Sequence, residues 1–429
     1  MKTICTAASA ALMTFALAST ALASDPLKVW MRYGDNEKNV LDQITKDFTA
    51  KTGVEIDLFL ANTDFETRLA RAAVGGSLPD VVVNDATAMG QMLDMGILKE
   101  VDRSAVQGGD QLYDVAWQSV QAQDGKFYGV PTSAQAFAVF IRKDWREKLG
   151  YDVPKTWDEL AELAKAFTEK DPDGNGKADT YGYVMPVSAT RGYASWFLSD
   201  LIWQAGGDFL AKKDNGYTSS LATPEVEKAV SFARDMICNG YAQPSAITAT
   251  TGDATPVFSS GQAGIYRSGP YHLAPFSKEP GRDKIEVIAP PAGPAGQAEL
   301  AEGEAAFITV SSTQDDAARQ FIEYLISAEG QQTGMAVGID SSPIVRLPVN
   351  KTVNVAEIQP DKAWATYADL YGKSGHYFPR VPNWKPIRQL TADGFNKILS
   401  DCSSDIAAGL AATDETVNVE LANQGVKAD

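Results

Sequence analysis

The stretch that decides the fold is Gly75–Asp85, with the sequence Gly-Gly-Ser-Leu-Pro-Asp-Val-Val-Val-Asn-Asp. Its two adjacent glycines end the helix expected before them, and three consecutive valines follow the proline and the aspartate. A short apolar run without alternation is typical of a strand buried on both faces, as in a parallel sheet covered by helices. Asn84 and Asp85 then follow the strand at the edge where open α/β sheets bind ligands.

The sequence before this strand contains elements of the same kinds. Leu27–Arg32 predicts a strand, apolar residues at helical spacing continue to Gly53, and Val54–Leu58 alternates apolar with acidic residues as a second strand. A further helix then leads to the strand at Val81–Val83. Strand, helix, strand, helix, strand implies right-handed crossovers and a largely parallel sheet. We therefore expect one α/β lobe here.

A comparable pattern restarts after Pro131. Phe137–Arg142 predicts a strand, and Thr156 with Glu159 forms a capping box for a helix that runs through Phe167. The predicted fold class is α/β with two lobes, each a mostly parallel sheet flanked by helices. Two such lobes leave a ligand cleft between them.

The first 23 residues have the features of a secretory signal peptide. The apolar run Ala7–Leu22 is too short to span a bilayer comfortably, and the small residues Ala21 and Ala23 suit cleavage before Ser24. Cys5 lies ahead of the apolar run and not at the cleavage point, so no lipid anchor is expected. These features predict an exported, periplasmic protein.

Composition narrows the function further. The chain has 429 residues, 44% of them apolar, and a net charge of −17 with lysine and arginine scattered singly. That length supports more than one core, and that charge makes nucleic acid and anionic membranes poor partners. An exported chain also meets little ATP or NAD(P)H. We therefore expect solute capture with no required cofactor.

The remaining reactive residues give no enzyme signature. Cys238 and Cys402 are able to pair in an oxidising compartment, but two separately buried thiols fit the sequence equally well. His272 and His376 are the only histidines, and neither has metal-ligand spacing. No triad, zinc site or phosphate-binding loop is visible. A secreted glycoside hydrolase needs only two carboxylates and stays an alternative, although we expect no enzyme.

Several motifs resemble those of a known family in their order and spacing. The segments are Phe48–Ile56, Gly75–Val82, Pro154–Leu160, Gly264-Ile265 with Ser268–Tyr271, and Ala317–Leu325. Together they resemble the extracellular solute-binding proteins of sugar ABC transporters, the family that includes maltose-binding protein. This resemblance implies the two-lobed periplasmic-binding-protein fold and a monomer that delivers a sugar or sugar alcohol to a membrane permease. The same architecture capturing a non-sugar solute, such as a polyamine, is the alternative.

The resemblance also implies discontinuous domains, because the chain crosses between lobes more than once in such proteins. The N-terminal lobe is expected to contain residues 24–131 and about 297–340. The C-terminal lobe is expected to contain residues 132–296 and 341–429.

The expected ligand residues follow from the chemistry of a sugar. A pyranose has a face of C–H groups and a belt of hydroxyls, so its site needs aromatic faces and planar polar groups. Family resemblance and strand ends together indicate the aromatic residues Trp196, Tyr271 and Trp384 and the polar residues Tyr33, Asp35, Asn84, Asp85, Glu304 and Arg388. Core packing is the alternative for the aromatic rings, and helix capping or simple solvation is the alternative for the polar groups.

A separate motif has the spacing of a calcium loop. Side-chain oxygens occupy positions one, three, five and nine of an EF-hand-like loop in Asp171, Asp173, Asn175 and Asp179. Gly176 stands at the sharp turn, and Lys177 would contribute its backbone carbonyl. Gly182 replaces the glutamate of position twelve, so a structural Ca²⁺ competes with an Asx-rich surface turn as the interpretation.

Overall fold

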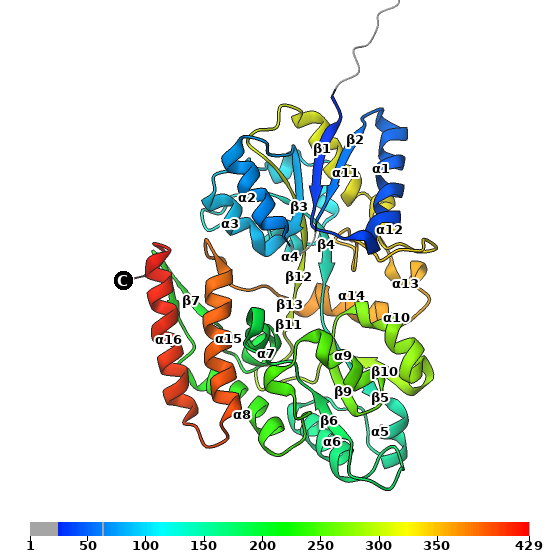
Figure 1. Ribbon diagram of the computed structural model, residues 1–429, viewed down its shortest axis with the longest axis vertical. Helices are drawn as coiled ribbons and strands as arrows, with labels where there is room; N and C mark the ends of the chain where they lie inside the picture. The colour runs from blue at the N-terminus through cyan, green and yellow to red at the C-terminus, as the bar shows by residue number, and fades with distance from the viewer. Residues whose placement is uncertain (1–24, 62–63, 429) are drawn as a thin grey trace, which may run out of the picture.

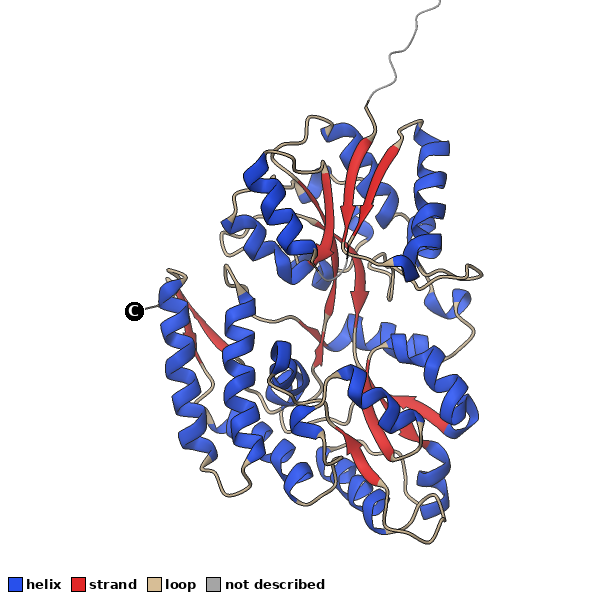
Figure 2. Ribbon diagram, viewed as in Figure 1, coloured by secondary structure: helices blue, strands red, loops and turns tan. Residues whose placement is uncertain are grey.

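A computed structural model describes residues 25–61 and 64–428. The expected signal peptide, residues 1–23, lies outside the described residues. The chain forms two bodies, drawn one above the other in Figure 1, with strands inside each body and helices around them (Figure 2). The two-lobed α/β class predicted from the sequence is therefore confirmed.

The upper body contains a five-stranded sheet in the order β2-β1-β3-β12-β4. The strands are β1 Leu27–Met31, β2 Ile56–Leu60, β3 Val81–Asp85, β4 Val130–Gln135 and β12 Glu302–Ile308. β1 pairs in parallel with both β2 and β3, as expected. β12 pairs antiparallel with β3 and β4, because it enters the sheet on a return passage from the lower body.

Local sequence explains the helices around this sheet. The first helix ends at Gly53, whose φ of 75° is the left-handed conformation that glycine adopts without strain. Its buried residues Val40, Leu41, Ile44 and Phe48 recur at helical spacing. The helices of this body are α1 Lys38–Thr52, α2 Phe65–Gly75, α3 Met89–Asp94, α4 Asp114–Gln118, α11 Asp315–Ile326 and α12 Ala328–Gly334.

The lower body contains a four-stranded sheet in the order β10-β5-β9-β6. The strands are β5 Ala138–Arg142, β6 Tyr181–Val184, β9 Ala263–Ser268 and β10 Ile285–Ile288. Only β6 and β9 pair in parallel, whereas β5 pairs antiparallel with both β9 and β10. The expectation of a mostly parallel second sheet is therefore wrong, because β5 enters this sheet in the direction opposite to β9 and β10.

Helices make up most of the rest of the lower body, and two of them follow sequence signals closely. Thr156 accepts a hydrogen bond from the Glu159 N–H at 3.3 Å, which confirms the expected helix start, and Pro224 occupies the first turn of α8. The helices are α5 Lys143–Leu149, α6 Trp157–Glu169, α7 Tyr193–Gln204, α8 Pro224–Cys238, α9 Thr251–Ser259, α10 Leu273–Phe276, α13 Val355–Ile358, α14 Ala363–Ser374, α15 Trp384–Ser400 and α16 Ile406–Asn423. Two short sheets pair β7 Leu210–Lys213 with β8 Gly216–Ser219, and β11 Glu299–Leu300 with β13 Gly375–His376.

Passages of the chain between the two bodies bear on the expected domain boundaries. β12 shares the upper sheet with β1 to β4, as a return of the chain near residue 297 requires. Beyond residue 340, however, Leu347 still bridges to Ala134 and Asn350 to Leu112. The proposed division stays a prediction, and these contacts favour a crossing later than residue 340.

Covalent and surface features complete the fold. Cys238 at the end of α8 is joined to Cys402 by a disulfide, with the Cα atoms 5.8 Å apart, so the pairing left open by the sequence is made.

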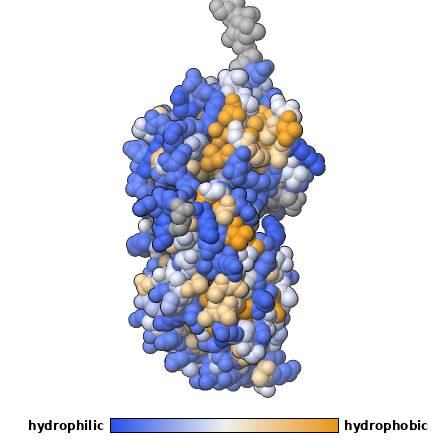
Figure 3. All heavy atoms as spheres, turned by 90° about the vertical axis from the view of Figure 1, so that its left-hand side faces the viewer, coloured by the Kyte–Doolittle hydropathy of each residue, from blue (hydrophilic) through white to orange (hydrophobic). Residues whose placement is uncertain are grey.

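None of the helices in the described part of the chain is long and apolar enough to cross a membrane. Figure 3 shows one face of the molecule, where hydrophilic side chains predominate and hydrophobic ones form small separate groups.

Candidate ligand-binding site

Two of the predicted acids meet at the edge of the upper sheet. Asp85 ends β3, and the antiparallel register of β12 places Glu304 directly opposite it. Arg32, which follows β1, forms an ion pair with Asp85. The carboxyl ends of β1 and β3 thus present charged side chains toward the same edge.

A residue absent from the sequence prediction joins these acids. Arg346 Nη1 lies 3.5 Å from Glu304 Oε1 and donates to Gln135 Oε1 at 2.7 Å. Burial lowers the pKa of Arg346, but the surrounding acidic groups, Glu304 foremost, together outweigh that effect, so its pKa is raised. Tyr33 lies beside this pair and donates its hydroxyl to the Ile344 carbonyl at 3.2 Å. Burial raises the pKa of Tyr33 well above its ordinary value.

The lower body contributes an aromatic ring to the same place. Tyr271 follows β9 in the short turn Pro270–His272, and 37% of its surface is exposed. Its ring centroid lies 5.9 Å from the Arg346 guanidinium carbon, and its hydroxyl accepts from Ser268 Oγ at 3.3 Å. The ring predicted to stack on a sugar is therefore accessible and faces the charged groups of the upper body.

Trp196 and Arg388 converge on a second glutamate of β12. Trp196 Nε1 donates to Glu302 Oε1 at 3.0 Å. Burial raises the pKa of the Glu302 carboxyl, and the positive charge of Arg388 opposes that rise. Arg388 also donates to the Arg191 carbonyl at 2.6 Å, which links α15 to the turn before α7. We use "interlobe cluster" below for Arg32, Tyr33, Asp85, Trp196, Tyr271, Glu302, Glu304, Arg346 and Arg388.

A glycine between the two glutamates lets β12 approach β4 closely. Gly303 separates Glu302 from Glu304, and a Cβ at that position would lie 2.1 Å from the Ser133 carbonyl oxygen of β4. Only the absence of a side chain permits so close an approach of the two strands. Alternation along the strand then directs Glu302 and Glu304 to the same side.

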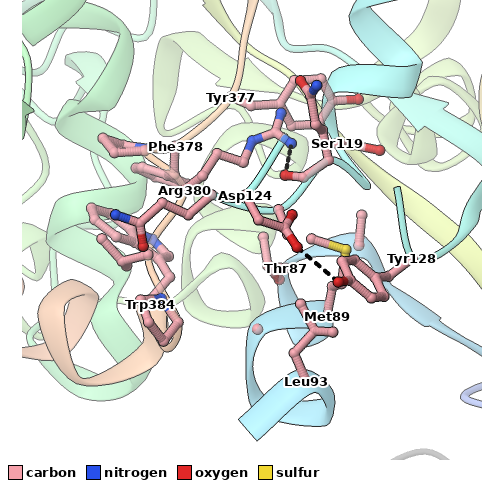
Figure 4. A pocket seen from close by; sticks show the side chains of 18 of the residues that line it. Thr87, Met89, Leu93, Ser119, Asp124, Tyr128, Tyr377, Phe378, Arg380 and Trp384 are labelled. Atoms are coloured by element: carbon pink, nitrogen blue, oxygen red, sulfur yellow. Dashed lines mark hydrogen bonds between the residues drawn. The ribbon is translucent and has the colours of Figure 1, made fainter. Parts of the chain in front are cut away.

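A cavity of about 370 Å³ lies beside the interlobe cluster (Figure 4). Its wall includes Ala86, next to Asp85 in sequence, and Ala301, next to Glu302. The predicted residue Trp384 also lines it, although the indole is only 6% exposed and stacks on Phe378 with ring centroids 4.8 Å apart. Trp384 thus combines a core-packing contact with one face of the cavity.

Two predicted polar residues have other surroundings. Asp35 is exposed and begins the short helical turn Asp35–Glu37. The Gly34 N–H donates to the Glu37 carboxylate at 3.0 Å and closes this turn. Asn84 is buried, and its Oδ1 accepts the Asp85 N–H at 2.8 Å. Asn84 therefore orients the backbone of Asp85, while no contact ties Asp35 to the cluster among the described residues.

Comparison with known proteins identifies the family of this chain. The family model for bacterial extracellular solute-binding proteins matches residues 34–332, well over half of the 429-residue chain. The chain belongs to this family.

Relatives of this solute-binding protein are distant in sequence. The polygalacturonan/rhamnogalacturonan-binding protein YtcQ of Bacillus subtilis is 29% identical over 259 residues, which are 55% of this chain and 48% of YtcQ. This chain thus spans about half the length of that relative. A putative binding protein of Brucella abortus is 23% identical over 393 residues, covering 91% of this chain and 92% of its own.

Solved structures share the fold of this solute-binding protein along nearly its whole length. The sugar-binding protein MalE of Xanthomonas citri has a TM-score of 0.76 at 23% identity, covering 93% of this chain and 98% of that protein. The GacH receptor of Streptomyces glaucescens has a TM-score of 0.75 at 19% identity, with the same coverage. Identities this low establish the two-lobed fold alone.

The candidate calcium loop of this solute-binding protein forms hydrogen bonds within itself. The Asp171 carboxylate accepts the N–H groups of Gly174 at 3.1 Å and Gly176 at 3.0 Å. Asn175 Nδ2 donates to Asp173 at 2.7 Å and to Asp179 at 3.1 Å, and the Lys177 N–H donates to Asn175 Oδ1 at 2.8 Å. In the described ranges no three His, Cys, Asp or Glu side chains converge as metal ligands. Calcium binding stays a prediction.

Sequence reasoning missed four members of the site's polar network. Glu302 had a usable signal, because a residue two positions from Glu304 on a strand shares its face. Arg32 and Gln135 also stand at strand ends, where ligand residues are expected. Arg346 lies in an irregular segment, so no periodicity or motif indicates it.

Proposed function

We propose that this protein captures a carbohydrate between its two bodies and delivers it to the membrane permease of an ABC importer. One observation carries the proposal: Tyr271 of the lower body faces Arg346, and Trp196 of the lower body bonds to Glu302 of β12, next to a cavity of about 370 Å³. A pyranose needs such a combination of aromatic faces and planar polar groups. Similar proteins support it, since they include a polygalacturonan-binding relative and solved structures in complex with acarbose and with tagatose.

The polar groups of the interlobe cluster are able to form hydrogen bonds with sugar hydroxyls. Asp85, Glu302 and Glu304 offer carboxylate oxygens, which accept hydrogen bonds from neighbouring sugar hydroxyls more strongly than neutral acceptors do. Arg346 supplies further donors. Because the contributing residues come from both bodies, a bound sugar bridges them and favours hinge closure. The closed form is the signal that the permease would recognise in the periplasm.

Charge balance in the interlobe cluster disfavours a polyamine. Its three carboxylates are matched by three guanidinium groups. Arg32 pairs with Asp85, and Arg346 lies 3.5 Å from Glu304. The charge of Arg388 counters the rise that burial causes in the pKa of Glu302. A polycation gains most from a site with net negative charge. We therefore expect spermidine and putrescine to bind weakly or not at all.

A glycoside hydrolase is disfavoured because the chain belongs to a family of solute-binding proteins. Glu302 and Glu304 then serve as acceptors for sugar hydroxyls, with Trp196 and Arg346 holding them in place. We expect the purified protein to release no reducing sugar from oligosaccharides that it binds.

A ligand screen tests the proposal. Thermal shift with mono- and oligosaccharides, sugar alcohols and polyamines should raise the melting temperature only with carbohydrates, because a ligand of the folded state stabilises it. Small-angle scattering with a saturating hit should give a smaller radius of gyration. A stabilising polyamine, or a sugar bound with no change in radius, would contradict the proposed ligand class or the closure mechanism respectively.

A further inference from the structure

The cavity beside the interlobe cluster contains an arginine without an acidic partner. Arg380 lies in the segment that connects β13 to α15, and its Nη1 donates to the Gln121 carbonyl at 3.0 Å (Figure 4). Its guanidinium carbon lies 5.8 Å from the Tyr377 ring centroid. In the described part of the chain no carboxylate forms a salt bridge with it. Burial without a compensating carboxylate lowers the pKa of Arg380 to about 10.

The acids that line the same cavity are engaged elsewhere or lie in solvent. Asp124 accepts the Tyr128 hydroxyl at 2.8 Å and the Lys126 N–H at 2.9 Å. Asp94 is exposed. The arginines of the interlobe cluster differ from Arg380, since an acid accompanies each of them. Neither of these two carboxylates of the cavity wall therefore forms an ion pair with Arg380.

The free donors of this cavity have a defined geometry. With Nη1 used by the Gln121 carbonyl, Arg380 keeps the edge formed by Nε and Nη2, which no described side chain or carbonyl occupies. That edge matches the two oxygens of a carboxylate in a bidentate pair. Trp384 Nε1 is buried in the wall and has no hydrogen-bond partner among the described residues.

We propose that Arg380 selects an acidic sugar, a uronic acid residue whose carboxylate pairs with the free guanidinium edge while its ring occupies the cavity in front of Trp384. The inference rests on the proposed carbohydrate function and narrows its substrate class. The free edge is planar and two-pronged, which matches the two oxygens of a carboxylate. The ion pair forms in a partly apolar cavity, where it is screened less than at an open surface.

Calorimetry with oligosaccharides that differ only in charge tests this. The probes are di- and trisaccharides of galacturonate and of glucuronate, their methyl esters, and the corresponding neutral and sulfated sugars. Wild type should bind at least one uronate about tenfold or more tightly than its methyl ester. Arg380→Gln should lose about tenfold or more for the uronate and less than about threefold for the ester. Arg319→Gln, which removes an exposed arginine of α11, should bind both as wild type does.

The possible outcomes separate the inference from the proposed function. Equal affinity for acid and ester, preference for a sulfated sugar, or an Arg380→Gln variant that binds the uronate normally would each overturn the inference. Binding of neutral sugars alone would overturn it and leave carbohydrate capture intact, whereas binding of no carbohydrate would remove both. If Arg380→Gln does not fold, Arg380→Lys keeps the charge without the fork and should still lose several-fold for the uronate alone.

Discussion

Replacing Arg267 by methionine should destabilise the protein severely, and the loss should grow with pH. Arg267 is 1% exposed on β9, with Nε 2.9 Å from Asp200 Oδ2 and 3.5 Å from Glu299 Oε2, both of them buried. Its guanidinium carbon also lies 5.8 Å from the ring centroid of Trp196, so Arg267 packs against a residue of the candidate site. Arg267→Met leaves two buried carboxylates without a cation, which costs about 3–5 kcal/mol of unfolding free energy.

The pH dependence follows from the acids. Burial raises the pKa of Asp200 to about 6, against the opposing charge of Arg267, while an unfolded aspartate titrates near pH 4. The folded state therefore holds more protons than the unfolded state between these values, so its stability falls as pH rises through that window. Without Arg267 the pKa values of Asp200 and Glu299 rise further. Each added pKa unit lowers the unfolding free energy at pH 7.5 by about 1.4 kcal/mol, whereas the unfolding free energy near pH 5 keeps that contribution.

Urea unfolding followed by tryptophan fluorescence at pH 5.0 and pH 7.5 measures this. The variant that combines Arg267→Met with Asp200→Asn and Glu299→Gln should recover much of the loss, because no buried charge remains. Arg319→Gln, at an exposed pair, should change stability by less than about 0.5 kcal/mol. An equal loss at both pH values, or no recovery in the triple variant, would refute the assignment of the effect to unpaired buried charge.

Three further predictions concern the site, the candidate calcium loop and the disulfide. Tyr271→Ala should weaken binding of the identified sugar about tenfold to hundredfold by calorimetry through lost apolar contact, and Tyr271→Phe should weaken it less; wild-type affinity in a folded alanine variant would return Tyr271 to a packing role. If the loop holds Ca²⁺, chelation should lower the melting temperature without abolishing sugar binding, and Asp173→Ala should remove that effect; indifference of wild type to chelator and added Ca²⁺ would leave only a turn. Replacing Cys238 and Cys402 by serine should lower the unfolding free energy by about 2–5 kcal/mol, because the bridge closes a loop of 164 residues; unchanged denaturation would contradict this.

Several elements were predictable because they depend on local sequence alone. Three local features lie where the sequence indicates: the valines of β3, the helix cap at Thr156 and the left-handed conformation of Gly53. Asp85 and Glu304, which the sequence placed near strand ends, lie opposite each other in the sheet, and their role in ligand binding stays a prediction. These predictions succeed because burial of an apolar run, helix capping and positive φ need no information from distant residues.

The contents of the site depended on distant parts of the chain. Arg346 reaches Glu304 and Gln135 from an irregular segment, and Glu302 lies between Trp196 and Arg388 of the other body. Similarly, β5 pairs antiparallel with β10 in one sheet, and β12 pairs antiparallel with β3 in the other. Both directions follow from the route of the chain between the bodies and not from the residues of either strand.

The sequence by itself determined that this protein has two α/β lobes and acidic side chains at strand ends, since strand, helix and cap signals are written within a few residues of each other. Only the tertiary structure decided which cations face those acids, that Cys238 pairs with Cys402, and that Arg380 forms no ion pair within the described residues. The physical reason is that ion pairs and disulfides depend on separations of a few ångströms between residues far apart in the chain. Those separations are fixed by packing and strand register, which no local pattern encodes.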